Sequence, residues 1–247
     1  MERRKRNYKK EEPEWIPKTA LGKQVKAGEI TSIDQILNSG KKILEPQIIS
    51  ALLPDFKDEV LKIKSTQRMT PCGRKMQMQA VVALGNKRGY VAVGLGKGPD
   101  TRMAITEAIA NAKRNIVRVP LGCGSWECSC GQAHSIIHQA TGQNSSTQIL
   151  IKPAPRGVGI VAGETAKKVL ALAGVNDVWT FAKGRTRNVL NTVLATLDAL
   201  DSLNSTKGNL LEKAVPLEEE TLPKEQEENQ EAPEKKDEST TPEPKKA

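Results

Sequence analysis

Apolar residues alternate with polar ones over residues 58–69, with Val60, Leu61 and Ile63 on the apolar side, which predicts a half-buried strand. Two further strands are predicted over residues 76–85 and 90–98, because the tight turn GNKRG, with glycine at each end, separates two apolar runs. Over residues 99–119 the apolar spacing becomes that of an amphipathic helix. Its expected cap is Asp100, and its expected apolar stripe is Ile105, Ala108, Ile109, Ala112 and Ile116. Three antiparallel strands and a covering helix predict a small α+β domain over residues 56–119.

A second small domain is expected over residues 147–205, with the order β-α-β-α. Its predicted elements are a strand over 146–155, the glycine loop RGVGIVAG, a helix over 164–173 that stops at Gly174, a strand over 175–184 and a helix over 186–203. On the last helix, Val189, Val193, Leu197 and Leu200 are expected to share one face. The fold class is therefore α+β, with two small domains and no internal repeat.

The flanking segments differ from the two domains in composition. Two short helices are expected within residues 31–55, whereas residues 15–27 are expected to be extended, broken by Pro17 and Gly22. The chain is therefore divided into a basic arm (1–14), an N-terminal extension (15–55), the first domain (56–119), a cysteine-rich connection (120–146), the second domain (147–205) and an acidic tail expected to be disordered (212–247).

Charge separates the body of the protein from its tail. The 247 residues carry a formal net charge of +9. Residues 212–247 hold 12 acidic and 6 basic residues, a net charge of −6, so residues 1–211 carry +15. Such an excess favours a polyanionic partner, nucleic acid ahead of an anionic membrane surface. Only seven residues are aromatic, which argues against recognition of single strands by stacked bases and favours folded RNA.

Several other classes of protein are disfavoured. No apolar run approaches the roughly 20 residues that cross a bilayer, and no signal peptide is apparent, so a soluble cytoplasmic protein without a membrane partner is expected. The string GVGIVAG is one residue longer than the dinucleotide fingerprint, and no Walker lysine motif occurs. Cys130 and His134 lack an orienting third group. We therefore expect no enzyme activity and no small-molecule substrate.

Basic residues concentrate at turns and helix ends, where an RNA backbone can be reached. An ordinary solvated surface is the alternative for any one of them. The candidate RNA-binding residues are Arg68, Gly73, Arg74, Lys75, Lys87, Arg88, Lys97, Arg102, Lys113, Arg114, Arg118, Lys183, Arg185 and Arg187.

The stretch LGCGSWECSCGQAH has the spacing Cys123-x4-Cys128-x-Cys130-x3-His134. Four ligand-type residues within twelve positions could hold one tetrahedral zinc ion, and a metal could order a connection that is poor in apolar residues. A loop of free thiols is the alternative, and no other cofactor is expected. Trp126 is interpreted as a packing anchor, and His138 as a surface or RNA-facing residue.

The strings MQAVVALGNKRGYVAVGLGKGPDTRMAITEAIANAKRNIVRV and ILIKPAPRGVGIVAGETAKKVLALAGVNDVWTFAKGRTRNVLNTVLATLDAL resemble the two domains of the small-subunit ribosomal protein five family. The first domain of this family resembles a double-stranded-RNA-binding domain. WIPKTALGKQVKAGEI and the cysteine stretch resemble the archaeal branch. Eukaryotic relatives are expected to lack the cysteines, so the zinc and free-thiol alternatives both stay open. A free-standing RNA-binding regulator is the rival interpretation.

The resemblance implies a structural constituent of the small ribosomal subunit. It implies binding to small-subunit rRNA, contacts with proteins four and eight of that subunit, and a position near the region where mRNA enters. It further implies that the protein stabilises the head of the subunit against the body and contributes to translational accuracy together with proteins four and twelve. RMTPCGRKM matches the family's rRNA-contacting loop, which points to Arg68, Gly73, Arg74 and Lys75. PRGVGIVAGETAKK matches the surface that faces protein four, which points to Arg156, Gly157 and Lys167.

Overall fold

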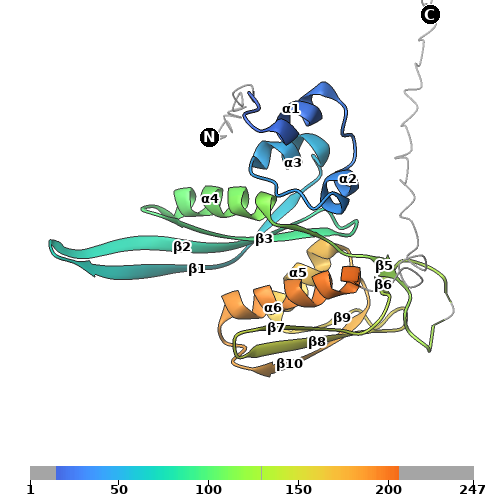
Figure 1. Ribbon diagram of the computed structural model, residues 1–247. Coiled ribbons are helices and arrows are strands. Elements are labelled where there is room, and N and C mark those ends of the chain that lie inside the picture. The colour runs from blue at the N-terminus through green and yellow to red at the C-terminus, as the bar shows by residue number, and fades with distance from the viewer. Residues whose placement is uncertain (1–14, 129, 206–247) are drawn as a thin grey trace, which may run out of the picture. The chain divides into compact units, whose positions relative to one another are not determined.

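The computed structural model of the protein describes residues 15–128 and 130–205 (Figure 1). The predicted basic arm and acidic tail lie outside the described residues. The α+β class is confirmed. Three short helices come first, α1 (Ala20–Ala27), α2 (Ile33–Asn38) and α3 (Pro46–Leu52). Among the described residues, no helix combines the length and apolar character needed to cross a membrane.

The first domain is an antiparallel sheet with one long helix against it. Its strands are β1 (Lys57–Thr70), β2 (Gly73–Gly85), β3 (Tyr90–Gly98) and β4 (Ile116–Arg118), paired in that order, and its helix is α4 (Thr101–Arg114). The three predicted strands are confirmed, and β4 adds a fourth that the sequence analysis did not predict. The predicted helix over 99–119 is too long, because Ile116–Arg118 pair with Tyr90–Ala92 of β3 instead of continuing the helix.

The second domain is built on a four-stranded sheet with the order β7-β8-β10-β9. Its strands are β7 (Ala140–Asn144), β8 (Thr147–Pro153), β9 (Ile160–Val161) and β10 (Val178–Gly184), and its helices are α5 (Glu164–Ala173), α6 (Val189–Ser202) and the short 3-10 helix η1 (Leu203–Ser205). The predicted strands β8 and β10 and helices α5 and α6 are confirmed. Strands β5 (Leu121–Gly122), β6 (Ser135–Ile136) and β7 lie within the stretch interpreted from sequence as a connection, and β9 lies within the predicted glycine loop.

The extended conformation predicted for residues 15–27 is wrong, because Ala20–Ala27 form helix α1. Thr19 caps this helix by accepting a hydrogen bond from the backbone N–H of Gly22, and Gly28 ends it in the left-handed conformation. Pro17 precedes the helix and so does not interrupt it. Gly22, the other predicted break, lies inside the helix, where it is buried and donates its N–H to the Thr19 cap.

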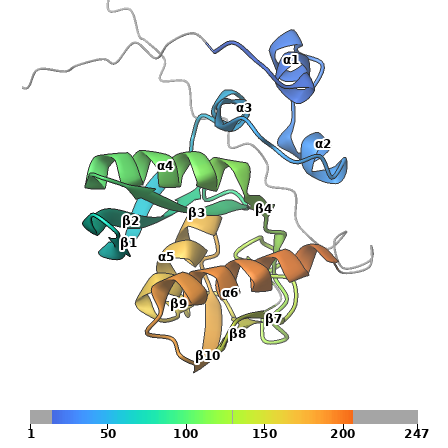
Figure 2. The same cartoon turned by 60° about the vertical axis from the view of Figure 1, so that its left-hand side comes forward.

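Strand β2 is covered on both of its faces (Figures 1 and 2). Ala80, Val82 and Leu84 pack in a cluster with α4 and the N-terminal helices. The alternate residues Val81 and Ala83 pack in a second cluster with α5 and α6. Because side chains of a strand alternate between faces, burial on both sides produces the continuous apolar run that the sequence displays here.

Two details of the predicted packing differ in the structure. Val60 and Leu61 lie beside opposite faces of the sheet, in different clusters, because successive side chains of a strand alternate between faces. A bulge between Val60 and Lys62 then shifts the register of β1 against β2. The buried face of α4 consists of Ala104, Ala108 and Ala112, with Ile105 and Ile109 only partly buried. The small side chains face the sheet because α4 lies so close to Gly94, Gly96 and Gly98 of β3 that larger ones have no room.

Helix α5 approaches the first sheet closely at the turn between β2 and β3. The backbone N–H of Lys87 donates to the carbonyl oxygen of Leu172 at 2.9 Å, and that of Gly89 donates to Ala173 at 3.0 Å. A Cβ atom added at Gly85 would overlap the backbone carbonyl of Leu172. At this point the two domains therefore meet backbone to backbone, without side chains between them.

We expect Gly85→Ala to destabilise the protein by about 1–3 kcal/mol, because the added methyl group must displace the backbone of α5. Denaturant unfolding of the full chain measures the change. Gly163→Ala is the matched control, since a Cβ there would meet no atom within 4 Å, and we expect it to change stability by less than about 1 kcal/mol. Equal stability of the two variants would contradict the close approach at Gly85.

Candidate RNA-binding surface and metal centre

Strands β1 and β2 continue beyond the sheet as a two-stranded ribbon, residues 66–77 (Figure 1). The last residue of β2 that pairs with β3 is Met78, so Gly73–Gln77 are bonded to β1 alone. Most side chains of this ribbon are exposed, including Met69 and Met76. A two-stranded ribbon of this kind is only marginally stable in water. The segment predicted from sequence as a loop is therefore mostly strand, and only Pro71 and Cys72 form its turn.

The ribbon carries basic side chains on both faces. Arg68 lies directly opposite Lys75, and Arg74 lies opposite Met69 on the other face. Two like charges on directly opposite positions destabilise a strand pair. All three basic side chains are exposed. A polyanion in contact with the ribbon would remove the repulsion between Arg68 and Lys75.

A second basic segment begins at the end of β10, where Lys183, Arg185 and Arg187 are all exposed. A small hollow lined by Lys62 and Lys64 of β1 and by residues 188–190 at the start of α6 joins this segment to the base of the ribbon. Lys62 and Lys64 were missed by the sequence analysis, because only their position on β1 beside α6 distinguishes them from other lysines of an alternating strand.

Other predicted RNA-binding residues hold the N-terminal helices. The ammonium group of Lys113 donates to the Ser50 hydroxyl at 2.6 Å, and Nε of Arg114 donates to the carbonyl oxygen of Leu44 at 3.1 Å. Arg118 lies 3.5 Å from Asp34, which also accepts a hydrogen bond from the Tyr90 hydroxyl. The predicted set therefore includes groups with internal partners. It also includes exposed groups at the turn between β2 and β3, at the end of β3 and at the start of α4, namely Lys87, Arg88, Lys97 and Arg102.

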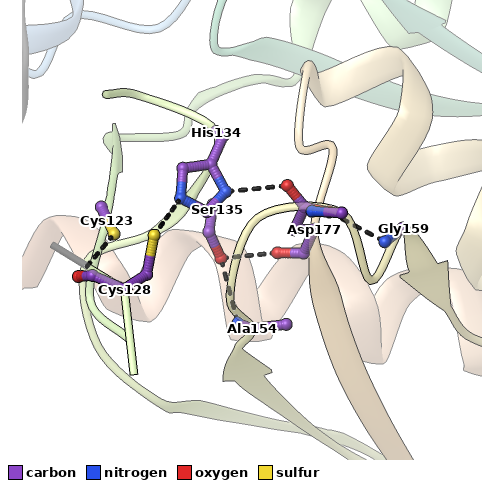
Figure 3. A network of polar contacts seen from close by, with 8 residues as sticks. Cys123, Cys128, His134, Ser135, Ala154, Gly159 and Asp177 are labelled. Carbon is purple, nitrogen blue, oxygen red and sulfur yellow. Dashed lines mark hydrogen bonds and ion pairs between the residues drawn. The ribbon is translucent and has the colours of Figure 1, made fainter. Parts of the chain in front are cut away.

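The cysteine stretch folds so that its four ligand-type side chains converge. The sulfur atoms of Cys123, Cys128 and Cys130 and a ring nitrogen of His134 all lie within 4.8 Å of one another. The Cys128 sulfur is 3.7 Å from Nε2 of His134 (Figure 3). A tetrahedral zinc ion, with Zn–S bonds of about 2.3 Å and Zn–N bonds of about 2.0 Å, would separate sulfur and nitrogen by roughly 3.5 Å. The cluster can therefore hold a metal ion of this size.

His134 is oriented by Asp177, a residue that the sequence analysis missed. Nδ1 of His134 lies 2.8 Å from Oδ2 of Asp177, and both residues are buried (Figure 3). The Ser135 hydroxyl donates to the Asp177 carbonyl oxygen at 2.6 Å. A carboxylate on the second nitrogen of a ligating histidine fixes its tautomer and its orientation. A single aspartate within a predicted strand gave no signal for this role.

The environments of two of the thiols differ. The backbone N–H of Arg156, together with contacts from Cys130 and His134, lowers the pKa of the Cys128 thiol to about 6. Burial, together with contacts to Cys130 and Cys128, raises the pKa of Cys123 to about 11. A thiolate is the form that binds metal ions. Cys128 is therefore already in its ligating form at neutral pH.

The glycine loop passes beside this cluster and presents its outer side to solvent. Of the predicted protein-contacting residues, Arg156 and Gly157 are exposed on this loop and Lys167 lies on α5. The side chains of Val158 and Val161, missed by the sequence analysis, are 38% and 49% exposed. Exposed apolar side chains with a basic rim are typical of a protein interface.

The interpretation of Trp126 as a packing anchor is wrong for the described chain, because this residue is 90% exposed. It lines an open hollow with Trp179, Phe181, His138 and Lys152, whose ammonium group lies 5.3 Å from the centre of the Phe181 ring. Nδ1 of His138 is buried and has no hydrogen-bond partner among the described residues, and His138 is not part of the cysteine cluster.

The α+β fold presents an exposed basic ribbon, which suits a polyanionic partner. Comparison with known proteins gives the family. A family model described as Ribosomal protein S5, N-terminal domain, matches residues 56–120, and one described as Ribosomal protein S5, C-terminal domain, matches residues 142–213.

Relatives from archaea are similar over most of the chain. A protein named Small ribosomal subunit protein uS5 from Methanocaldococcus jannaschii is 54% identical over 194 residues, which are 78% of this chain and 89% of the relative. Proteins of the same name from Methanoregula boonei and Methanospirillum hungatei are 52% and 51% identical, over 78% and 77% of this chain and 95% and 93% of the relatives. The chain belongs to the ribosomal protein S5 family, and the resemblance found in the sequence is confirmed.

The acidity of the Cys128 thiol gives a testable result. In metal-free, reduced protein at pH 7, we expect an alkylating reagent to modify Cys128 before Cys123, because only the thiolate reacts. The modification rate of Cys128 should fall as the pH drops below about 6, whereas that of Cys123 should still rise up to about pH 11. Peptide mass spectrometry at a series of pH values measures both rates, and equal rates at pH 7 would contradict the assignment.

Proposed function

We propose that the protein is a structural, non-catalytic component of the cytoplasmic small ribosomal subunit that binds small-subunit rRNA. Its membership of the S5 family carries this proposal, since relatives about half identical over most of their length are named for that subunit. The excess of basic residues in the body supports an RNA partner. The finer role follows the family resemblance: the protein lies near the region where mRNA enters, touches proteins four and eight, and stabilises the head against the body. In this position it contributes to translational accuracy together with proteins four and twelve.

The ribbon of residues 66–77 is the proposed principal rRNA contact. Basic side chains on both of its faces suit insertion between two stretches of RNA backbone better than docking on one. Its opposed Arg68 and Lys75 also favour an arrangement in which phosphates lie close to both. Lys62, Lys64, Lys183, Arg185 and Arg187 extend this surface from the base of the ribbon. Lys87, Arg88, Lys97 and Arg102 are proposed as peripheral phosphate contacts, and Lys113, Arg114 and Arg118 mainly as residues that hold the N-terminal helices.

The loop at Arg156 and Gly157, with Lys167 of α5, is the proposed contact with protein four. The exposed side chains of Val158 and Val161 supply the apolar centre that a protein interface needs.

A binding experiment tests the RNA contact. We expect Arg74→Ala combined with Lys75→Ala to weaken binding to small-subunit rRNA. The plot of log affinity against log salt concentration should become less steep by roughly 1 for each phosphate that the variant no longer neutralises. Lys41→Ala with Lys42→Ala is the matched control, because this adjacent, exposed pair lies outside the proposed surface and changes the charge equally. An unchanged slope in the ribbon variant, or an equal change in the control, would overturn the assignment.

Sedimentation of cell extracts in the same salt series tests whether the protein is bound to the small ribosomal subunit. The unmodified protein should remain with the small subunit at physiological salt, and the ribbon variant should dissociate at lower salt. A protein that sediments mostly free would instead be the RNA-binding regulator considered from the sequence.

Cys123, Cys128, Cys130 and His134 are proposed to hold one structural zinc ion. Four protein ligands leave no open coordination position, so such an ion would order the chain and would not catalyse a reaction. We expect about one equivalent of zinc in protein purified under reducing conditions, with Cys130→Ser lowering this content. Cys72→Ser is the control, because Cys72 is exposed at the tip of the ribbon and lies outside the cluster. Zinc well below one equivalent in the unmodified protein would favour the free-thiol loop.

A further inference from the structure

Asp177 lies between the cysteine cluster and the glycine loop and touches both (Figure 3). One carboxylate oxygen, Oδ2, lies 2.8 Å from Nδ1 of His134. The other oxygen, Oδ1, accepts the backbone N–H groups of Gly157 at 3.0 Å and Gly159 at 2.8 Å. The Asp177 side chain is only 7% exposed. A single buried carboxylate thus joins a candidate metal ligand to two amides of a surface loop.

The loop has a second connection to the same cluster. The backbone N–H of Arg156 lies near the Cys128 thiol and interacts with it. The N–H groups of Gly157 and Gly159 are therefore held by the partner of the histidine ligand, and the N–H of Arg156 lies near a cysteine ligand. Gly157 and Gly159 both have positive φ, which fits the backbone path that aims these N–H groups at the carboxylate.

The backbone on the other side of Asp177 is also fixed. The carbonyl oxygen of His134 accepts the N–H groups of Asn176 at 2.9 Å and Asp177 at 3.1 Å. The Ser135 hydroxyl, which donates to the carbonyl oxygen of Asp177, also accepts the N–H of Ala154 at 3.4 Å. The carboxylate thus has little freedom to move independently of His134.

A metal ion on Nε2 of His134 requires the ring proton to be on Nδ1, where it is donated to Asp177. This bond holds the carboxylate in the position that accepts the two glycine N–H groups. Without the metal, the ring can carry its proton on Nε2 or change its orientation, and Oδ2 of the carboxylate then loses its histidine donor, while Oδ1 keeps only the two glycine N–H groups.

We propose that Asp177 couples metal binding to the conformation of the Arg156–Gly159 loop, so that zinc occupancy orders the surface offered to a neighbouring protein. This inference rests on the proposed zinc site and names a consequence of filling it. Coupling between two sites is reciprocal, so a protein partner that orders this loop would in turn tighten metal binding. Asp177 acts here as a positioning residue and does not itself bind the metal.

Hydrogen exchange of the full chain tests the coupling. Exchange is measured by mass spectrometry on zinc-loaded protein and on protein freed of zinc by a chelator under reducing conditions. We expect zinc removal to accelerate exchange of the amides at 156–159 by about 5–150-fold, the range typical of coupled sites. Exchange in α4 should not change, because this helix is not in contact with the cluster.

The variant Asp177→Asn tests the link itself. Asparagine keeps the size of the side chain, but its amide group must face either His134 or the two glycine N–H groups with a donor. We expect zinc affinity, measured by competition with a chromophoric chelator, to fall by about 10–100-fold. The effect of zinc on loop exchange should shrink as well, even at zinc concentrations that saturate the variant.

Asp198→Asn is the matched control. Asp198 also accepts a backbone N–H, that of Gln143 at 3.0 Å, in the same domain, but it is not in contact with the cysteine cluster. We expect this variant to keep the zinc affinity and the zinc-dependent exchange of the unmodified protein.

The ways in which the proposal can fail are distinguishable. If the unmodified protein binds no zinc, the proposed metal site fails and the coupling fails with it. If zinc binds at one equivalent but loop exchange is the same with and without it, the coupling is overturned while the metal site stands. If zinc protects the loop equally in Asp177→Asn, the link does not run through Asp177. The comparison of loaded and metal-free unmodified protein decides the coupling even if the variant does not fold.

Discussion

Burial of strand β2 on both faces is the constraint on which the rest of the structure depends. Ala80, Val82 and Leu84, on one face of β2, pack against α4 and the N-terminal helices. Val81 and Ala83, on the other face, pack against α5 and α6. This arrangement requires helices to approach the sheet within backbone contact, and glycines at the points of closest approach permit it. The fixed position of α5 in turn places the glycine loop that precedes it.

Strands β1 and β2 become more exposed where the helices no longer cover them. Beyond Met78, toward the turn at Pro71 and Cys72, no third strand pairs with β1 and β2. Most side chains of this ribbon are exposed, and several are basic. A bare ribbon with like charges opposite each other gains little stability from its own contacts. A polyanion can supply both the cover and the counter-charge, so the segment that is weakest in the isolated chain is also the one proposed to contact RNA.

The cysteine stretch brings four ligand-type side chains together next to short strands that also contribute Leu121 and Ile136 to the core. Short strands β5 and β6 pair with each other, and the side chains of Cys123, Cys128, Cys130 and His134 meet beside the second sheet. Through Asp177 this cluster reaches the loop before α5. Polar contacts between side chains from separate segments of the chain thus add to the core contacts of Leu121, Ile136 and Ala140, and a metal ion would strengthen them.

The sequence by itself determined the α+β class, strands β1–β3, β8 and β10, and the presence of helices α2, α3, α4, α5 and α6, because their apolar periods and caps are local properties. It also determined which residues could bind a metal, since their spacing is short. Tertiary structure decided the remaining features. Ile116–Arg118 became a strand because β3 offered a free edge, and Trp126 is exposed because no described element packs over it. Asp177 lies 43 positions from His134, and Lys62 lies beside the start of α6 only in the folded chain. Pairings over such distances depend on how the two domains pack, and no local pattern in the sequence encodes them.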